Sequence, residues 1–374
     1  MVINIASFGG RTHMLDTARE LARHGHTVRF YSYVPTKRAV RYGLPKECSF
    51  SLFYLALPFL VLFKIFGHTE ALTYTYWRIY DIITAFILKP CDVFIGQSPM
   101  HIHSINRAKK KFGAITILEC GSMHVKDFVR ILNKDPQLKG KPCMSSKAEQ
   151  RDIKSYIYPD YLSVGSIMVR DSFIAHGIEE SKIFINNYGY DPFQFYPTEL
   201  ETQHYDILMV GQWSYRKGAD LITELCKQYQ YRFLHVGPLL MPFPAVYNMT
   251  HIDAVDQTQL IKYYSKAKVF LLPSREEGLA LVQLQALACG LPLVCSRFSG
   301  GVELTKYCKS SDWVIECKSF SIEEIHKAIN KALSLAATQH GKRSIFVKDA
   351  TLKAYGNRYN DFLTKIYSKT NHHF

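Results

Sequence analysis

The chain has 374 residues, of which 47% are hydrophobic, including 23 Phe and 24 Tyr. A chain of this length and aromatic content can bury more than one core, which excludes intrinsic disorder as its dominant state. The formal net charge of +14 favours an anionic partner such as nucleic acid, an anionic membrane or a phosphorylated small molecule, although a solubility bias explains the same excess.

The chain opens with the apolar segment 2–7, for which we expect a buried strand. No basic stretch precedes an apolar core there, so the segment lacks the pattern of a secretory signal. Nine cysteines are scattered singly, without any C-x-x-C pair. This pattern argues against a disulfide framework and against a structural zinc site, so we expect a reducing, cytoplasmic compartment.

Short apolar runs alternate with helical patterns along the whole chain. Most runs are continuously apolar, which is typical of strands buried between helices in a parallel sheet. The alternation predicts a doubly wound α/β architecture. We expect strands at 2–7, 27–32, 92–96, 114–119, 161–164, 183–186, 205–210, 231–236, 268–272, 291–295 and 313–315.

The strand and helix series runs twice, which predicts two Rossmann-like domains of similar size. The first domain spans residues 1–195, and the second spans residues 205–348. The stretch 198–204 has the polar composition of a linker, and we expect a last amphipathic helix within 349–374. Because ligands of parallel sheets bind at the carboxyl ends of the strands, a cleft between the domains is the expected site.

Residues 48–63 form an uncharged apolar run that contains Pro58 and is followed by Lys64. The run is shorter than the roughly 20 residues that a membrane-spanning helix needs. We expect a buried strand followed by the start of a helix. The alternative is a segment that rests on an anionic membrane, because further cations lie nearby, namely Lys37, Arg38, Arg41 and Lys46.

Two segments place glycines before helix N-termini, where anions bind. Residues 8–11 (FGGR) follow the first strand, but they lack the spacing of a nicotinamide site and by themselves favour an ordinary turn. Residues 210–219 open a helix and carry Arg216 and Lys217. Two cations at such a position suit a pyrophosphate better than a solvated basic turn.

Two further segments place carboxylates at the ends of expected strands. Residues 271–294 run from a strand through Glu276 and Glu277 into an apolar helix. Gln285 is a lone amide on that helix, and a buried amide needs hydrogen-bond partners, which ligand hydroxyls could supply. Residues 299–304 (SGGVEL) form a glycine loop that contains another carboxylate.

Together these segments resemble the retaining nucleotide-sugar glycosyltransferases of GT-B fold that carry an E-x7-E motif, the group 1 or family 4 type. Where that family has G-R-x-x-x-x-K-G, this chain has GQWSYRKG at 211–218. Where the family has P-S-x-x-E-G-x-G-x-x-x-x-E-A-x-A-x-G, this chain has PSREEGLALVQLQALACG at 273–290. Residues 9–28 and 176–197 fit as well, so the resemblance covers nearly the whole chain.

The resemblance implies roles for individual residues. Lys217 would bind the donor diphosphate, Glu277 would lie at the donor sugar, and the last helix would pack back onto the N-terminal domain. A histidine on the N-terminal side of the family's cleft contacts the sugar and the reacting centre. The implied catalytic residues are His124 and Glu277, and the implied donor-binding residues are Gly10, Gln212, Arg216, Lys217, Glu277, Gly278, Leu279, Ala280, Leu281 and Gln285.

His124 follows an expected strand in the sequence ECGSMH, but a structural loop histidine fits the same position. His101 and His103 are rivals, since they follow the strand expected at 92–96. Glu119 could support the site as a neighbour of the catalytic group.

The chain departs from the family at three positions. Gln212 replaces an Arg, for which Arg216 could compensate, and Ala280 replaces a common Gly. Gln285 replaces the second motif Glu, so a ribose contact there would lose its charge-assisted strength.

The resemblance implies transfer of a sugar from a nucleotide diphosphate donor to a glycan or lipid-linked acceptor, with retained configuration. It also implies that the domain 1–195 binds the acceptor and that the domain 205–348 binds the donor. No D-x-D motif occurs, so we expect neither a metal nor another cofactor. The alternatives are a nucleotide-sugar epimerase of the same fold and a non-catalytic sugar-nucleotide-binding partner of another transferase. No nucleic-acid-binding motif is present, so we expect no nucleic-acid partner.

Overall fold

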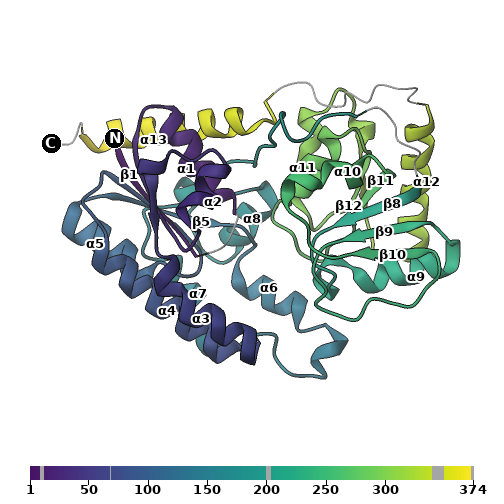
Figure 1. The fold of residues 1–374 in the computed structure, drawn as a ribbon, viewed down its shortest axis with the longest axis horizontal. Helices are drawn as coiled ribbons and strands as arrows, with labels where there is room; N and C mark the ends of the chain where they lie inside the picture. Colours follow the sequence, from purple (N-terminus) through teal and green to yellow (C-terminus); the bar gives the residue numbers. More distant parts are fainter. Residues whose placement is uncertain (9–11, 68, 199–203, 339–348, 372–374) are drawn as a thin grey trace.

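The computed structural model describes residues 1–8, 12–67, 69–198, 204–338 and 349–371, which form two α/β domains side by side (Figure 1). Each domain is built on a parallel sheet. The N-terminal sheet has the strand order β3-β2-β1-β4-β5-β6-β7, and the C-terminal sheet has the order β10-β9-β8-β11-β12-β13. The prediction of two doubly wound parallel-sheet domains is therefore confirmed.

The N-terminal domain buries its strands between helices, so Ile3, Ile5 and Ala6 of β1 have no exposed surface. Its strands are β1 (Val2–Ser7), β2 (Thr27–Ser32), β3 (Ser49–Ser51), β4 (Val93–Gln97), β5 (Ile115–Cys120), β6 (Tyr161–Val164) and β7 (Ile183–Ile185). Its helices are α1 (His13–Arg23), α2 (Thr36–Arg41), α3 (Phe53–Phe66), α4 (Glu70–Ile87), α5 (Ile102–Phe112), α6 (Val125–Leu132), α7 (Ser146–Ser155) and α8 (Ile167–Ala175).

The C-terminal domain repeats this plan with a smaller sheet. Its strands are β8 (Tyr205–Val210), β9 (Phe233–Val236), β10 (Met249–Ile252), β11 (Ala267–Leu272), β12 (Leu293–Ser296) and β13 (Val314–Cys317). Its helices are α9 (Ala219–Tyr229), α10 (Ile261–Tyr264), α11 (Leu281–Ala288) and α12 (Ile322–Ala337), and the chain then enters α13 (Leu352–Asn371).

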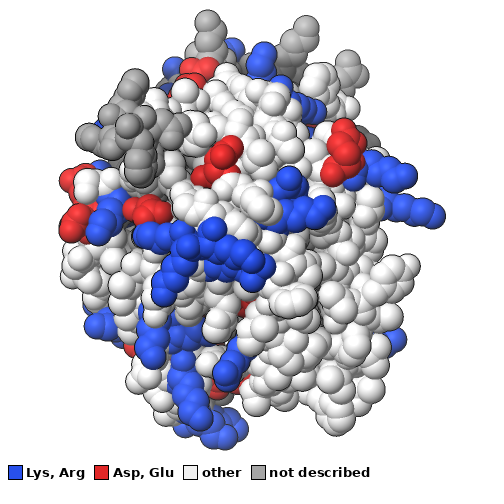
Figure 2. Space-filling view, turned by 90° about the vertical axis from the view of Figure 1, so that its left-hand side faces the viewer, with Lys and Arg blue, Asp and Glu red and all other residues white. Residues whose placement is uncertain are grey.

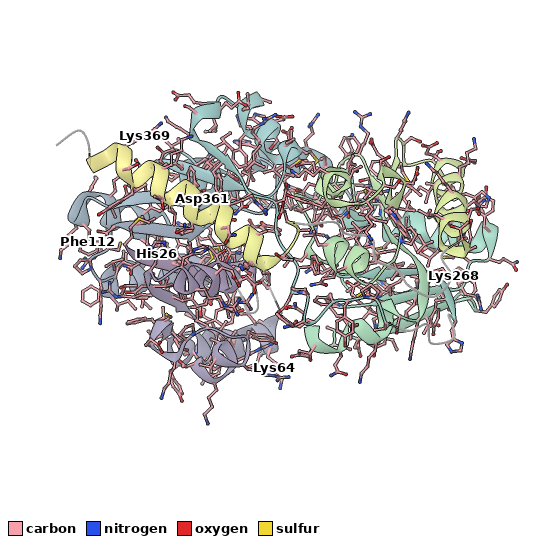
Figure 3. The ribbon with its side chains drawn as sticks, turned by 90° about the horizontal axis from the view of Figure 1, so that it is seen from above. His26, Lys64, Phe112, Lys268, Asp361 and Lys369 are labelled. Atoms are coloured by element: carbon pink, nitrogen blue, oxygen red, sulfur yellow. The ribbon has the colours of Figure 1, made fainter. Side chains whose placement is uncertain are left out.

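Helix α13 leaves the C-terminal domain and lies across the N-terminal domain (Figures 1 and 3). The hydroxyl groups of Tyr355 and Thr17 are hydrogen-bonded at 2.8 Å, and Phe362 stacks on Phe184 with ring centroids 4.0 Å apart. The helix approaches α1 so closely that a methyl group at Gly356 would lie 2.5 Å from Cβ of Glu20. The last helix therefore ties the end of the chain to its first domain.

Both sheets reverse their strand order beside a central strand, and this is where parallel sheets bind ligands. In the N-terminal sheet β1 lies between β2 and β4, and in the C-terminal sheet β8 lies between β9 and β11. The loops that follow β4, β8 and β11 are therefore placed to form a site.

The segment 48–66 differs from the expected buried strand and helix start. The strand β3 is half-buried and only three residues long, and α3 exposes many of its apolar side chains. Pro58 lies inside α3. Among the described residues, none of the helices combines the length and the apolar character needed to cross a bilayer.

The close approach of Gly356 to Glu20 leads to a prediction about the stability of the fold. Gly356→Ala should lower the free energy of unfolding by about 1–3 kcal/mol through overpacking, although alanine gains roughly 1 kcal/mol in helix propensity. Urea unfolding would measure the change, with Lys365→Ala on the exposed face of α13 as the control. A more stable Gly356→Ala variant would contradict the observed packing.

Candidate active site

The loops that follow β8 and β11 bring the predicted donor-binding residues together. The two strands are paired in the C-terminal sheet, so their carboxyl ends lie side by side. After β8 the chain forms the 3-10 turn Tyr215–Lys217 (η4), and the backbone N–H of Arg275 donates to the carbonyl of Arg216 at 2.8 Å. This bond joins the basic turn to the carboxylate-bearing loop after β11.

Four charged side chains form a cluster on these two loops. Nη1 of Arg216 lies 2.9 Å from Oε2 of Glu276 and 3.8 Å from Oε2 of Glu277. Nζ of Lys217 pairs with the same oxygen of Glu277. Glu276 is completely buried, and Lys217 and Glu277 are nearly so. Because the pairs are desolvated, removal of one partner would leave its neighbour buried and uncompensated.

The third cation of these loops, Arg275, is engaged elsewhere. Its guanidinium makes two hydrogen bonds of 2.7 Å to the carboxylate of Asp220 and lies 3.7 Å from the centre of the Tyr215 ring. Arg275 is therefore paired outside the cluster that Arg216 and Lys217 form with Glu276 and Glu277.

Lys217 lies in a strongly perturbed electrostatic environment. Burial is the largest influence and lowers its pKa well below the usual range. The Arg216 guanidinium acts in the same direction, and the Glu276 carboxylate opposes both. A diphosphate bound beside the ammonium group would favour its charged form.

The loop after β11 also touches the N-terminal domain. The backbone N–H of Met123 donates to Oε1 of Glu276 at 3.2 Å. A methyl group at Gly278 would overlap the carbonyl oxygen of Gly121, so glycine is required at this contact. Leu279, the next residue, is buried. The predicted donor-binding segment therefore lies at the boundary between the domains.

The start of α11 is joined to the neighbouring glycine loop by Gln283, which the sequence analysis missed. Its Nε2 donates to Oγ of Ser299 at 2.7 Å, and its Oε1 accepts from the backbone N–H of Ala280 at 3.4 Å. Leu281 begins the helix. The signal that singled out Gln285, an amide on an otherwise apolar helix, could also have identified Gln283.

The carboxylate of Glu303, in the fourth segment, also reaches across to the N-terminal domain. Its Oε1 accepts from the backbone N–H of Ile167 at the start of α8, at 2.5 Å. Its Oε2 accepts from Nδ2 of Asn187 at 3.2 Å. Glu303 therefore holds the domains together, as Glu276 does.

Gln285 lies buried on α11, eight positions after Glu277. Its Oε1 accepts a hydrogen bond of 3.1 Å from the hydroxyl of Tyr264. No described residue accepts a hydrogen bond from its Nε2. Tyr264 therefore sets the orientation of the amide.

Gln212 and Arg216 line a cavity of about 210 Å³ between the domains. Ser214 and Tyr215 line the same side, and residues 132–143 of the N-terminal domain contribute the opposite wall. The remaining predicted donor-binding residue, Gly10, lies outside the described residues. The structure thus places the side chains of Gln212 and Arg216 at the domain cleft.

His124 lies within the N-terminal domain. Its ring stacks on His176 with centroids 4.2 Å apart and contacts Tyr156 and Phe173. Its Nδ1 accepts from the backbone N–H of Lys126 at 3.3 Å, which leaves Nε2 as the protonated nitrogen of the neutral ring. Burial, helped by His176 and Lys126, lowers its pKa to about 4 against the influence of Asp127. Among the described residues, the ring of His124 contacts N-terminal side chains and not Glu277, so its catalytic role stays a prediction.

Of the rival residues on the N-terminal side, His101 lies 3.9 Å from the carboxylate of Asp81, and neither of its ring nitrogens has a hydrogen-bond partner among the described residues. His101 is completely buried, and burial lowers its pKa to about 4, with Asp81 opposing and Arg151 assisting. The backbone N–H of His103 donates to Asp81 at 2.8 Å. Glu119 is buried and accepts from the hydroxyl of Tyr359 at 3.2 Å. Among the described residues, no group of three or more His, Cys, Asp and Glu side chains is arranged to hold a metal ion.

The C-terminal half of the chain is similar to known glycosyltransferases. Residues 247–350 match the family described as Glycosyl transferases group 1. AmsK, an amylovoran biosynthesis glycosyltransferase of Erwinia amylovora, is 29% identical over 163 residues, which are 38% of this chain and 40% of AmsK. Such alignments cover between 12% and 48% of the length of the curated relatives that this chain matches.

Solved structures of similar fold match over almost the whole chain. HepE of Anabaena, solved with UDP and glucose, has a TM-score of 0.65 at 12% identity and covers 97% of this chain and 99% of HepE. Sucrose-phosphate synthase of Thermosynechococcus elongatus has a TM-score of 0.64 at 14% identity. The match covers 98% of this chain and 99% of the synthase chain. With the family match, this shared fold confirms the resemblance to GT-B glycosyltransferases of group 1, whereas retention stays a prediction.

The charge cluster leads to a prediction about the binding of a nucleoside diphosphate. Lys217→Ala should weaken the binding of a nucleoside diphosphate by about 1–3 kcal/mol, because a charge-assisted contact is lost. Titration calorimetry would measure the affinity, with Lys227→Ala at the exposed end of α9 as the control.

Lys217→Ala also leaves the Glu277 carboxylate buried without its partner, so the variant should unfold more easily. The double variant Lys217→Met, Glu277→Gln removes both charges and separates affinity from stability. Unchanged affinity in a folded Lys217 variant would remove this residue from the donor site.

Proposed function

We propose that this chain, with a GT-B fold and a C-terminal domain that matches the group 1 glycosyltransferases, transfers a sugar from a nucleoside diphosphate donor to an acceptor hydroxyl with retained configuration. The observation that carries the proposal is the cluster of Arg216, Lys217, Glu276 and Glu277 at the carboxyl ends of β8 and β11. Negative charge develops on the leaving diphosphate, and two fixed cations would stabilise it as it forms.

The similar proteins support the donor class and a role in glycan assembly. The structure of HepE was solved with UDP and glucose, and the name of AmsK refers to amylovoran biosynthesis. We therefore assign the donor to the nucleoside diphosphate sugars and the acceptor to glycans or lipid-linked glycans of a surface polysaccharide. Gln285 would contact the ribose, and the backbone of Gly278–Leu281 would meet the sugar and phosphate.

The proposed chemistry uses no divalent metal. The chain has no D-x-D sequence to bridge a metal to the diphosphate. Arg216 and Lys217 would supply the positive charge at the leaving group instead, close to the start of α9.

A thermal-shift panel tests the donor site directly. Sugars of UDP, GDP, ADP, CMP and dTDP would be added with and without EDTA. A ligand that binds only the native state raises the melting temperature, and we expect one nucleotide class to do so equally in both conditions. Loss of the shift in EDTA would contradict metal-independent binding.

The same donor then distinguishes the alternatives. A transferase forms a product only with an acceptor, whereas an epimerase converts the sugar without one. The neutral residues Gln212 and Gln285 favour the second alternative, a sugar-nucleotide-binding partner without turnover. Stabilisation without turnover over a broad acceptor panel would support that alternative and overturn the proposed transferase activity. Proton NMR of a transferred product would show whether configuration is retained.

We further propose peripheral contact with the cytoplasmic face of an anionic membrane through the pair of helices α3 and α4. Tyr54 is 84% exposed and Phe86 is 78% exposed, and Ile65 and Phe66 are also exposed. Lys64 on α3 and Arg78 on α4 are exposed as well, and Figure 2 shows Lys and Arg side chains beside a broad uncharged area. Exposed apolar side chains beside cations suit an anionic lipid surface.

Vesicle sedimentation tests the membrane contact. The protein should bind vesicles that contain phosphatidylglycerol more than vesicles of phosphatidylcholine alone, and salt should weaken the binding. Ile65→Asp combined with Phe66→Asp should abolish binding, whereas Phe193→Asp, at an exposed site outside the two helices, should not. Equal recovery in the supernatant with both vesicle types would overturn the contact.

A further inference from the structure

Two histidines of the C-terminal sheet lie side by side behind the loop that follows β8. His235 lies on β9 and His251 lies on β10, and the two residues are partners in the register of these strands. Nδ1 of His235 lies 2.9 Å from Nδ1 of His251, and the two rings are nearly parallel. Because both residues belong to paired strands, the sheet itself fixes the contact between the rings.

A second hydrogen bond joins His235 to the β8 loop, which is residues 211–218 and carries Arg216 and Lys217. Nε2 of His235 lies 2.8 Å from the carbonyl oxygen of Gly211. A carbonyl oxygen can only accept, so Nε2 of His235 carries a hydrogen atom and donates it. His235 therefore holds the first peptide group of the β8 loop.

The β8 loop also packs closely on the segment that follows β9. A methyl group at Gly237 would overlap the carbonyl oxygen of Gly211, so that oxygen lies against backbone on one side. The backbone N–H of Trp213 donates to the carbonyl of Pro238 at 2.9 Å. The indole of Trp213 is completely buried and contacts the ring of His235, with centroids 5.1 Å apart. The histidine therefore touches the loop through both backbone and side chain.

His235 is neutral in this position. The residue has no exposed surface, and burial lowers its pKa to about 4; the Gly211 carbonyl opposes this shift and His251 assists it. With its hydrogen on Nε2, the neutral ring has a lone pair on Nδ1, so Nδ1 can only accept. His251 must therefore donate the hydrogen bond between the two rings.

His251 makes a further contact through its other nitrogen. Its Nε2 lies 3.2 Å from Oδ1 of Asp253, and a carboxylate can only accept. His251 therefore satisfies both of its contacts only when both ring nitrogens carry hydrogen, which is the charged form of the ring. Histidine is the side chain whose charge ordinarily changes near neutral pH. When His251 loses a proton, one link of this chain of hydrogen bonds is lost.

The surroundings of the histidine pair are otherwise aromatic. Asp253 is the only charged side chain among the described residues with a hydrogen bond or ion pair to either ring. The rings of Trp213 and Phe243 contact His235, and Phe243 also contacts His251. The side chain of His251 is 19% exposed and that of Asp253 is 97% exposed. Water can therefore exchange a proton with His251 while His235 stays enclosed.

We infer that His235 is a positioning residue for the β8 loop, and that the proton on His251 sets how firmly His235 holds the Gly211 carbonyl. A charged donor at Nδ1 of His235 polarises the ring and strengthens the bond from its Nε2, because hydrogen bonds in a chain reinforce one another. The loop that carries Arg216 and Lys217 is thus held for a diphosphate at lower pH and held more weakly once His251 is neutral. The inference rests on the proposed function for the identity of the ligand, but not for the link between the histidines and the loop.

Nuclear magnetic resonance of the full chain tests this link without any ligand. With isotope-labelled histidine, the ring signals report which nitrogens carry hydrogen. From about pH 5.5 to about pH 8.5, we expect His235 to keep its hydrogen on Nε2 and His251 to lose one of its two. The amide signal of Gln212, which shares a peptide group with the Gly211 carbonyl, should move with the same midpoint. In His251→Asn, whose amide can donate to His235 at every pH, this movement should be absent.

Donor affinity tests the consequence for the proposed site. The probes are UDP-glucose, GDP-mannose and ADP-glucose, because a diphosphate between a nucleoside and a sugar has no proton to lose near neutral pH. As the pH rises, the wild type should lose about three- to tenfold more affinity than His251→Asn, which corresponds to one hydrogen bond. The comparison with His251→Asn is needed because burial lowers the pKa of Lys217, so that Lys217 weakens binding in the same direction in both proteins.

Substitutions of His235 separate positioning from packing. His235→Gln keeps an N–H group near the place of Nε2 but breaks the link to His251. It should keep most of the affinity and lose the part of the pH profile that depends on His251. His235→Leu removes the bond to Gly211 and should weaken binding about three- to tenfold at low pH. If His235→Gln, folded as judged by its melting temperature, binds as weakly as His235→Leu, the role is packing and the inference is overturned.

The matched control is His204→Asn. His204 is exposed and precedes β8, at the end of the strand opposite the β8 loop. This variant should keep the wild-type pH profile of donor affinity and the wild-type movement of the Gln212 signal. Loss of either in His204→Asn would show that the pH dependence does not come from His251 and would overturn the inference.

The remaining outcomes are also decisive. A Gln212 signal that does not follow His251, or identical pH profiles in the wild type and His251→Asn, would overturn the inference even if the protein transfers sugar. A signal that follows His251 in a protein that binds none of the three probes would support the link to the loop and count against the proposed donor. The two proposals therefore fail separately.

Discussion

The backbone contact between Gly278 and Gly121 is the constraint on which the rest of the site depends. No side chain fits at position 278, and Gly300 in turn packs against Gly278 and Ser166. Because the contact joins backbone to backbone, rotamer changes cannot relax it. It fixes the loop that carries Glu277 against the N-terminal domain, so the donor loop belongs to a surface that both domains build.

The position of the loop against the N-terminal domain also explains the charge cluster. Arg216 and Lys217 lie in a water-poor boundary, where unpaired cations would be strongly unfavourable, and the carboxylates of Glu276 and Glu277 balance them. The cations are thus oriented before a ligand arrives, which is how fixed charges stabilise a leaving group with little reorganisation. Two of the three departures from the group 1 pattern fit this balance, because Gln212 replaces a positive residue and Gln285 replaces a negative one. Together they leave the summed charge of the donor site unchanged.

The sequence predicted most of the fold because continuous apolar runs are a strong signal for buried parallel strands. It missed β10, which is a short edge strand with half-buried residues. It expected a buried strand at the start of 48–63, whereas β3 is a short, half-buried edge strand. It identified Arg216, Lys217 and Glu277 through spacing, and the structure joins these residues in one cluster. It could not place His124, because the direction of a ring after a strand depends on the aromatic side chains of Tyr156 and Phe173, which come from other elements. His235 carried no signal at all, since one histidine in the apolar run 231–236 is ordinary until its surroundings are known.

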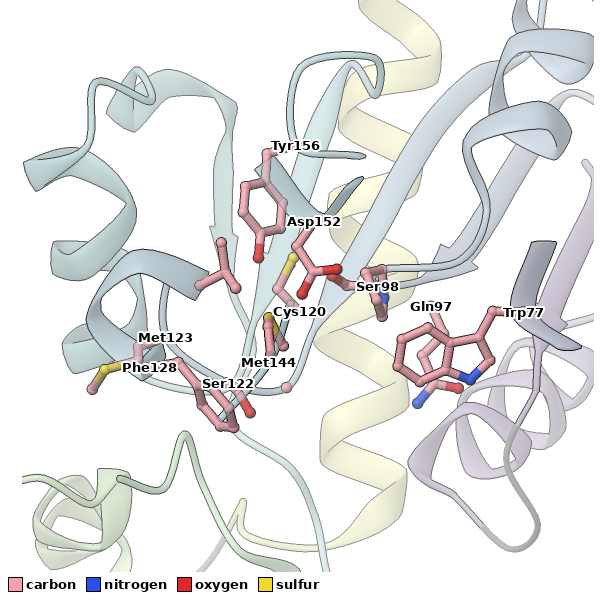
Figure 4. A pocket seen from close by; sticks show the side chains of 13 residues that line it. Trp77, Gln97, Ser98, Cys120, Ser122, Met123, Phe128, Met144, Asp152 and Tyr156 are labelled. Atoms are coloured by element: carbon pink, nitrogen blue, oxygen red, sulfur yellow. The ribbon is translucent and has the colours of Figure 1, made fainter. Parts of the chain in front are cut away.

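A second cavity, of about 280 Å³, lies at the carboxyl ends of β4 and β5 in the N-terminal domain (Figure 4). The two cavities differ in the charged residues that line them, so the two sides of the cleft suit different ligand groups. The cavity beside Gln212 and Arg216 offers a guanidinium group to an anion, whereas Asp152 is the only charged residue among the described residues that line the second cavity. The Arg216 guanidinium can therefore contact an anion on the C-terminal side, whereas the described lining of the N-terminal cavity offers an anion no cation. The wall at Gly121–Met123 is common to the cavity and the domain contact. Oδ1 of Asp152 is buried without a hydrogen-bond partner among the described residues, which lowers stability, and its presence at this sheet edge is understandable if it keeps anions on the C-terminal side of the cleft.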